Sequence, residues 1–246
     1  MPDIFDTPGL LWLAGAALVA GLVRGFSGFG TAMIYLPVAA QVLSPIWAIV
    51  TLTIMELVGP MPNIPRAWRD GHRADLVRLA IGLTVVLPLG LALLAIIRPE
   101  TYRYVLSGLS LALLVCLVLG LRWRGELRPP LVYGIGGFSG LSGGIAGLPG
   151  PPVILLYMAS PHPANVIRAN TMLHLFFFDW LLLVMIAMRG ELGWTPMMIG
   201  AMLIVPNLVG NIVGGWLFRP EHEALYSWVA YVIIAASALS GLPLWD

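Results

Sequence analysis

The fold is decided by residues 25–55, GFSGFGTAMIYLPVAAQVLSPIWAIVTLTIM, a stretch that contains no Asp, Glu, Lys or Arg. A second stretch without these residues covers 129–167. A helix crosses a bilayer core with about 20 apolar residues, so each stretch is long enough for two membrane segments. Shorter uncharged runs lie at 7–23, 79–97, 104–121, 192–218 and 224–245. The sequence therefore predicts a polytopic helical membrane protein.

Composition supports this class. Hydrophobic residues make up 59% of the 246 residues and charged residues 10%, whereas a soluble domain carries roughly 25% charged residues. Lipid admits only helices or closed barrels, and the alternating pattern of barrel strands is missing, so we expect an all-α fold. The net charge of +1 gives no reason to expect nucleic acid as a partner, and the single cysteine excludes an internal disulfide. The short loops leave no room for a catalytic domain, and we expect no cofactor and no metal.

The Gly-Phe-Ser-Gly motif occurs twice. GFSGFG at 25–30 is repeated as GFSGLS at 137–142. Each copy is followed by Leu-Pro, Ser-Pro and a further proline in the same order, beginning at Leu36, Ser44 and Pro88 and at Leu148, Ser160 and Pro206. This predicts two pseudo-symmetric repeats, residues 1–124 and 125–246, as is common in transporters.

Each repeat is expected to contain five segments, giving about eight to ten membrane segments in all. The expected bounds are about 8–24, 30–43, 45–62, 76–97 and 101–121, then 129–141, 149–160, 163–188, 194–218 and 223–244. If every segment crosses, the repeats are inverted; if the short second segments re-enter, the repeats are parallel. The inverted arrangement places more arginines on the cytoplasmic side, which favours it. It would bring the two glycine-rich breaks together near the midplane.

These breaks are the predicted substrate site. Broken backbone is tolerated in lipid only where it is buried in protein or lines a cavity, and the helix N-termini that it creates attract anions. The other reading of the motif is close packing of helices on small residues. The residues of the predicted breaks are the glycines Gly28, Gly30, Gly140 and Gly143, with the hydroxyls of Ser27, Thr31, Ser139 and Ser142.

Ionisable and amide side chains inside the segments are further candidates, because such groups are costly in lipid. Arg24 and Arg168 are expected to attract an anion, or else to anchor segment ends. Asn170 and His174, one helical turn apart, are expected to bind the substrate or to join helices. Buried carboxylates bind protons more readily than in water, so two of them are candidates for proton coupling or for structural ion pairs: Glu56 and Asp179.

The two motif copies, the Leu-Pro pairs and the Arg-rich turn at 66–73 resemble the TauE/SafE family, the sulfite exporter-like membrane transporters. The resemblance spans nearly the whole chain. It implies a carrier in the bacterial inner membrane for small anions such as sulfite, sulfonates, sulfoacetate or thiosulfate, with no catalytic residues. Protons and sodium are the candidate coupling ions, and the sequence does not indicate an oligomeric state.

Two other functions remain open at the level of sequence. An anion channel would use the same breaks without alternating access. Gly-x-Ser-Gly also resembles the nucleophile motif of rhomboid intramembrane serine proteases, with Ser139 as nucleophile and His174 as base. Duplication of the motif weighs against the protease, because an enzyme needs one nucleophile and His174 has no counterpart for Ser27.

Overall fold

The computed structural model describes residues 9–120, 127–157, 160 and 162–244. These residues form helices and no strand, which confirms the all-α prediction. The helices are α1 (Leu10–Ser27), α2 (Thr31–Ala39), α3 (Pro45–Leu57), η2 (Met61–Asn63), α4 (Ile64–Asp70), α5 (Arg73–Ile96), α6 (Pro99–Val118), α7 (Pro129–Ala146), α8 (Gly150–Tyr157), α9 (Ala164–Met188), α10 (Trp194–Leu217), η3 (Pro220–His222) and α11 (Glu223–Ser240).

Several of these helices are long enough to cross a membrane. Five of them, α1, α5, α6, α9 and α10, have the length and hydropathy of a span, and α3 with η2–α4 would make a sixth, bent by 48°. The helices α2 and α8 have nine and eight residues, which corresponds to about 13 Å, less than half of a bilayer core of about 30 Å. The multi-pass class is confirmed, whereas the expected eight to ten segments include short helices whose course stays a prediction.

The chain folds into two compact units, each made from both halves of the sequence. Among the described residues, the first unit comprises 9–56, 98–114 and 192–244, and the second comprises 57–97, 115–120, 127–157, 160 and 162–191. The boundary predicted near residue 124 divides sequence repeats, and these compact units follow a different division.

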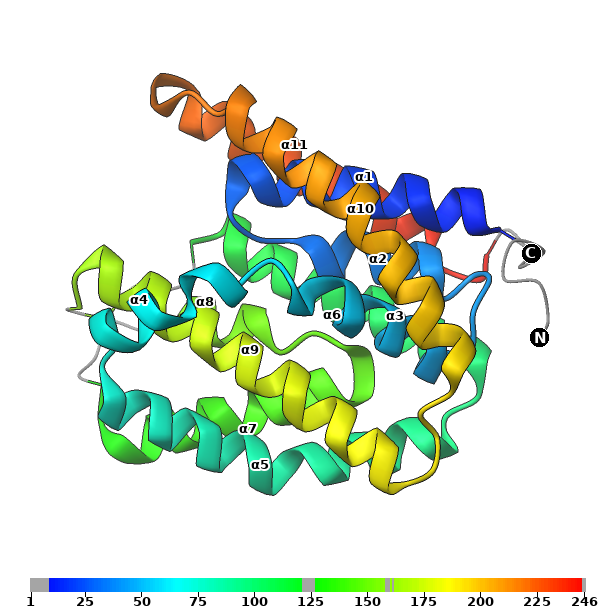
Figure 1. Cartoon of the computed structure of the whole chain (residues 1–246), viewed down its shortest axis with the longest axis horizontal. Coiled ribbons are helices and arrows are strands. Elements are labelled where there is room, and N and C mark those ends of the chain that lie inside the picture. The colour runs from blue at the N-terminus through cyan, green and yellow to red at the C-terminus, as the bar shows by residue number, and fades with distance from the viewer. Residues whose placement is uncertain (1–8, 121–126, 158–159, 161, 245–246) are drawn as a thin grey trace. The chain divides into compact units, whose positions relative to one another are not determined.

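In the second unit, α5 and α7 form the most extensive helix pair (Figure 1). Their backbones touch through glycines. A Cβ atom added at Gly136 would lie 2.3 Å from the carbonyl oxygen of Leu79, and one added at Gly82 would lie 2.2 Å from that of Tyr133. Glycine is therefore required at both positions, because real Cβ atoms do not approach so closely.

In the first unit, α1 and α10 form the corresponding pair. A Cβ atom added at Gly21 would lie 2.1 Å from the carbonyl oxygen of Asn207, and one added at Gly210 would lie 2.2 Å from that of Leu18. The amide of Asn207 also donates to the carbonyl oxygen of Ala17 at 3.2 Å. Each pair joins the first segment of one predicted repeat to the fourth segment of the other. The inverted relation of the repeats stays a prediction.

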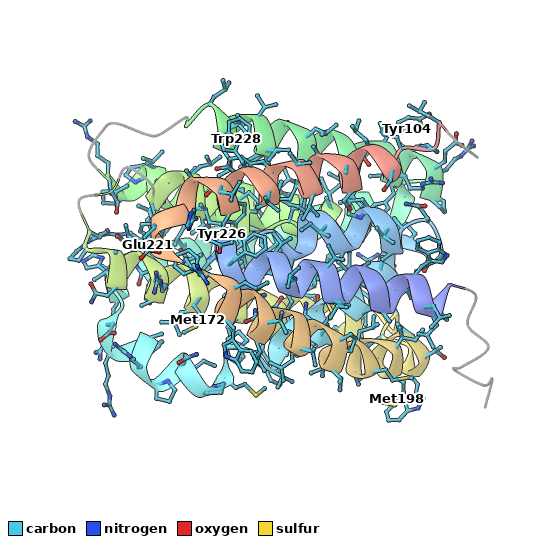
Figure 2. The ribbon with its side chains drawn as sticks, turned by 90° about the horizontal axis from the view of Figure 1, so that it is seen from above. Tyr104, Met172, Met198, Glu221, Tyr226 and Trp228 are labelled. Atoms are coloured by element: carbon cyan, nitrogen blue, oxygen red, sulfur yellow. The ribbon has the colours of Figure 1, made fainter. Side chains whose placement is uncertain are left out.

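Aromatic side chains are exposed along the helices, as expected of a protein that faces lipid and its interfaces. Figure 2 shows Tyr226 and Trp228 on α11; Trp228 is 60% exposed. Trp12, Trp68 and Trp194 are likewise more than half exposed. These tryptophans are suited to anchor helix ends in the interface.

The glycine contacts can be tested with two substitutions on α7. Gly136→Ala should lower the thermal unfolding temperature in detergent, by the equivalent of about 1–3 kcal/mol, because its methyl group meets backbone. Gly134→Ala is the matched control, since a Cβ atom there meets nothing within 4 Å. Equal stability of the two variants would contradict the packing described for α5 and α7.

Candidate functional site

The first Gly-Phe-Ser-Gly motif breaks the chain as predicted. Helix α1 ends at Ser27, and α2 begins at Thr31. Gly28 and Gly30 both have positive φ values, 80° and 98°, a conformation that side chains disfavour. The Ser27 hydroxyl lies 2.7 Å from the carbonyl oxygen of Val23 and 3.0 Å from that of Phe29. Ser27 therefore stabilises the break itself.

Beyond this break, three polar side chains meet at the N-terminus of α2. Arg24 forms an ion pair with Glu56 of α3, and its Nη1 lies 3.5 Å from the hydroxyl oxygen of Thr31. Thr31 is 3% exposed, and no side chain caps α2. The free N–H groups of a helix's first turn carry a partial positive charge. A cation, a hydroxyl and an uncapped helix N-terminus thus surround one point. The carboxylate of Glu56 pairs with the cation there.

The second motif does not break the chain where it was predicted to. Helix α7 was expected to end near residue 141, but it continues to Ala146 and ends at Gly147, whose φ is 68°. The expected break residues Gly140 and Gly143 lie inside the helix. A Cβ atom at Gly140 would lie 2.7 Å from the carbonyl oxygen of Leu83, and one at Gly143 would lie 2.4 Å from the Phe178 ring. The contacts of Gly140 and Gly143 are those expected where helices pack closely on small residues.

The serines of the second motif bind the turn that follows α7. The Ser139 hydroxyl lies 2.7 Å from the carbonyl oxygen of Pro149 and 2.8 Å from Nε2 of His174, and the Ser142 hydroxyl donates to the carbonyl oxygen of Leu148 at 2.9 Å. Helix α8 then begins with Gly-Pro-Pro. Proline has no N–H, so the first turn of α8 has fewer donors for an anion than that of α2.

Asn170 and Asp179, which were expected near the site, lie on α9. Asn170 accepts a hydrogen bond from the backbone N–H of His72 at 2.9 Å and donates to the Tyr157 hydroxyl at 2.8 Å, so it joins three segments. Asp179 is buried and has an interaction partner. Asn170 thus has the role of joining helices, whereas the proton-coupling role of Asp179 stays a prediction.

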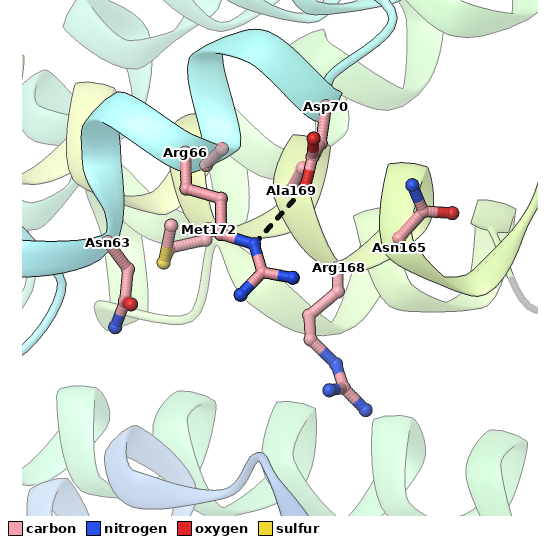
Figure 3. Close-up of a pocket in the computed structure, with 8 residues that line it drawn as sticks. Asn63, Arg66, Asp70, Asn165, Arg168, Ala169 and Met172 are labelled. Carbon is pink, nitrogen blue, oxygen red and sulfur yellow. Dashed lines mark ion pairs between the residues drawn. The ribbon is translucent and has the colours of Figure 1, made fainter.

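Arg168 lines a separate pocket of about 340 Å³ between α4 and α9 (Figure 3). Arg66 lines it too and pairs with Asp70, with Nε 3.6 Å from Oδ2. The amides Asn63 and Asn165 complete its polar lining. Helix α4 was not predicted, because the Arg-rich turn that contains it is short and polar. The pocket combines two guanidinium groups with two amides and the carboxylate of Asp70, so its lining keeps a net positive charge, which is suited to anions.

Several apolar helices, a break between α1 and α2, and polar groups buried among the helices are features found in polytopic transporters. The model of the sulfite exporter TauE/SafE family matches residues 13–241. The chain belongs to the TauE/SafE family. No curated protein and no solved structure matches the chain. The predicted resemblance is thereby confirmed, and the chain is a membrane transporter.

In this TauE/SafE chain, Ser139 and His174 lie in contact, with Oγ 2.8 Å from Nε2. Within the described residues the buried Nδ1 of His174 has no hydrogen-bond partner. Ser139 is completely buried in the middle of α7, and its hydroxyl also bonds the carbonyl oxygen of Pro149. These contacts fit a structural role for Ser139.

Ser139 provides a direct test of that reading. We expect a serine-reactive fluorophosphonate probe to leave the purified protein unlabelled, because the hydroxyl is buried and hydrogen bonded to Pro149. Ser139→Ala should lower the unfolding temperature by the equivalent of about 1–3 kcal/mol, since it leaves the carbonyl oxygen of Pro149 unpaired. Labelling that disappears in Ser139→Ala would contradict a structural role.

Proposed function

We propose that this chain carries a small sulfur-containing anion, such as sulfite, thiosulfate or sulfoacetate, across the bacterial inner membrane by alternating access. The observation that carries the proposal is the meeting of Arg24, Thr31 and the uncapped N-terminus of α2. The family relationship supports transport, and the resemblance to sulfite exporters supports the substrate class.

Glu56 gives this site a way to exchange ligands. Its carboxylate pairs with the guanidinium of Arg24. Both side chains are only partly exposed, Glu56 by 18% and Arg24 by 26%. An uncompensated charge in such a place is unfavourable. An incoming anion can therefore replace Glu56 on Arg24 only if the displaced carboxylate is also neutralised. Proton uptake by Glu56 offsets one negative charge of the incoming anion, so a monoanion leaves the net charge of the site unchanged and a dianion such as thiosulfate changes it by −1.

This exchange accounts for coupling to protons. In the anion-free state Arg24 is paired with Glu56. In the loaded state Arg24, Thr31 and the amides of α2 bind the anion, and Glu56 carries a proton. Anion and proton then move together, with one proton for each anion bound, because one carboxylate, that of Glu56, is displaced. The oxygens of a sulfur oxyanion match the donors at this point, because each can accept several hydrogen bonds.

The pocket that contains Arg168 is suited to a different step. Arg66 is largely exposed, with 85% of its side chain accessible, so an anion can reach the pocket without displacing a buried group. Exposed arginines concentrate anions near a protein surface and are sensitive to salt. We assign to this pocket the capture of anions at the surface of the second unit.

Flux into proteoliposomes tests the site. Wild-type protein should take up radiolabelled thiosulfate, and an inward proton gradient should drive its accumulation. Arg24→Gln should reduce flux at least tenfold, because it removes the charge that binds the anion. Glu56→Gln imitates the protonated carboxyl, so it should retain exchange but lose accumulation by the proton gradient. Arg168→Gln should raise the half-saturating concentration and leave the maximal flux near that of the wild type.

Arg189→Gln is the matched control. Arg189 follows the last turn of α9 and pairs with Glu191 at the surface. It should behave as the wild type in every assay. Flux through Arg24→Gln equal to that through Arg189→Gln would contradict the proposed site. Accumulation by Glu56→Gln that still follows the proton gradient would contradict the proposed coupling.

A further inference from the structure

Two histidines and a buried aspartate meet beside the start of α5. His72 immediately precedes this helix, Asp75 is in its first turn, and His162 lies just before α9. Nδ1 of His72 lies 3.1 Å from Oδ2 of Asp75, and Nε2 of His162 lies 3.0 Å from the same oxygen. The three donor atoms lie within 4.8 Å of one another. All three residues belong to the second unit.

The carboxylate of Asp75 is held so that its two oxygens have different partners. Nη1 of Arg78 lies 3.1 Å from Oδ1, which leaves Oδ2 to the two imidazoles. The Asp75 side chain is only 3% exposed, whereas His72 and His162 are 45% and 22% exposed. One carboxylate oxygen thus lies at the bottom of a shallow site, between two nitrogens that solvent can reach.

The two histidines are positioned by contacts of their own. The backbone N–H of His72 donates to Oδ1 of Asn170, and that of His162 lies 3.3 Å from the hydroxyl oxygen of Ser160. The imidazole rings lie side by side, with centroids 4.8 Å apart. These bonds hold the backbone from which each imidazole extends, and so keep the two rings beside Asp75.

We propose that His72, Asp75 and His162 bind a divalent transition-metal ion of the zinc type. Two imidazole nitrogens and one carboxylate oxygen are donors that Zn²⁺ accepts, whereas Ca²⁺ and Mg²⁺ require mostly oxygen ligands. Zinc–ligand distances of about 2.0–2.2 Å imply separations of about 3.3–3.5 Å between ligands of a tetrahedral ion. The two nitrogen–oxygen distances, 3.1 and 3.0 Å, are slightly shorter than these values. The two nitrogens lie within 4.8 Å of each other and would approach by rotation of the partly exposed rings.

Three protein ligands leave a fourth position for water or a small anion. Each imidazole presents its lone pair to the ion and carries its proton on the other ring nitrogen. The ion would bind together the start of α5, the segment before α9 and, through Asn170, α9 itself. The site is independent of Arg24, so it stands or falls separately from the proposed transport function.

The competing explanation is a triad held only by hydrogen bonds, in which both imidazoles donate to Oδ2 of Asp75. Amide substitutions distinguish the two. In His72→Asn an amide N–H takes the position of Nδ1, and in His162→Gln it takes the position of Nε2, while the nitrogen ligand is lost. A hydrogen-bonded triad tolerates these changes, whereas a metal site does not.

Cobalt titration of the full-length protein in detergent, with any affinity tag removed, tests the proposal. Wild-type protein should bind one equivalent of Co²⁺ with the intense visible absorption of a four-coordinate ion, and Zn²⁺ should abolish that absorption. His72→Asn, His162→Gln and Asp75→Asn should each weaken binding at least tenfold. His222→Gln is the matched control, because His222 is an exposed histidine outside this cluster and should bind as the wild type.

Thermal unfolding of each variant without metal establishes that it is folded, and Zn²⁺ should raise the unfolding temperature of the wild type and His222→Gln only. The proposal is overturned if the wild type binds less than one equivalent of Co²⁺. It is also overturned if folded His72→Asn and His162→Gln bind the ion as tightly as the control, which would leave a hydrogen-bonded triad.

Discussion

Contact between the backbones of neighbouring helices is the constraint on which this fold depends. Lipid tails are as apolar as the side chains, so burying a side chain between helices gains little hydrophobic free energy in a membrane. Helices therefore associate through close packing and hydrogen bonds. The α5–α7 and α1–α10 pairs both use glycines that face carbonyl oxygens of the partner. Helix–helix packing of this kind allows a chain with few polar side chains to hold a broken segment at a fixed place.

The two copies of the motif have acquired different chemistry on this common framework. After the first copy, the short helix α2 begins without a side-chain cap beside Arg24, which is paired with Glu56. Arg24 can therefore exchange Glu56 for another anion when Glu56 is protonated. After the second copy, the helix is continuous through the glycines, and its serines bind the turn that precedes two prolines. The proposed anion site therefore uses the first break, while the serines of the second motif hold the turn between α7 and α8.

The sequence predicted the number and approximate bounds of the main helices, because uncharged runs and glycine–proline punctuation report directly on the lipid environment. It did not predict that α7 continues to Ala146, since glycine density indicates a break or a packing surface equally well. It predicted an ion pair as one role of Glu56 but did not identify Arg24 as the partner, because Arg24 is distant in sequence and the pairing depends on how α3 packs against α1. The cluster of His72, Asp75 and His162 was missed for the same reason. Local patterns identify helices, whereas contacts between helices require the tertiary structure.

Counterflow tests the central claim, that this protein is a carrier which presents one anion site to each side of the membrane in turn. Proteoliposomes are loaded with unlabelled thiosulfate and diluted into a trace of labelled thiosulfate. Alternating access predicts a transient accumulation of label above its equilibrium level. External sulfite or sulfoacetate should inhibit this accumulation by competing for the site. Label that only approaches equilibrium, at a rate proportional to concentration, would contradict the account and indicate a channel.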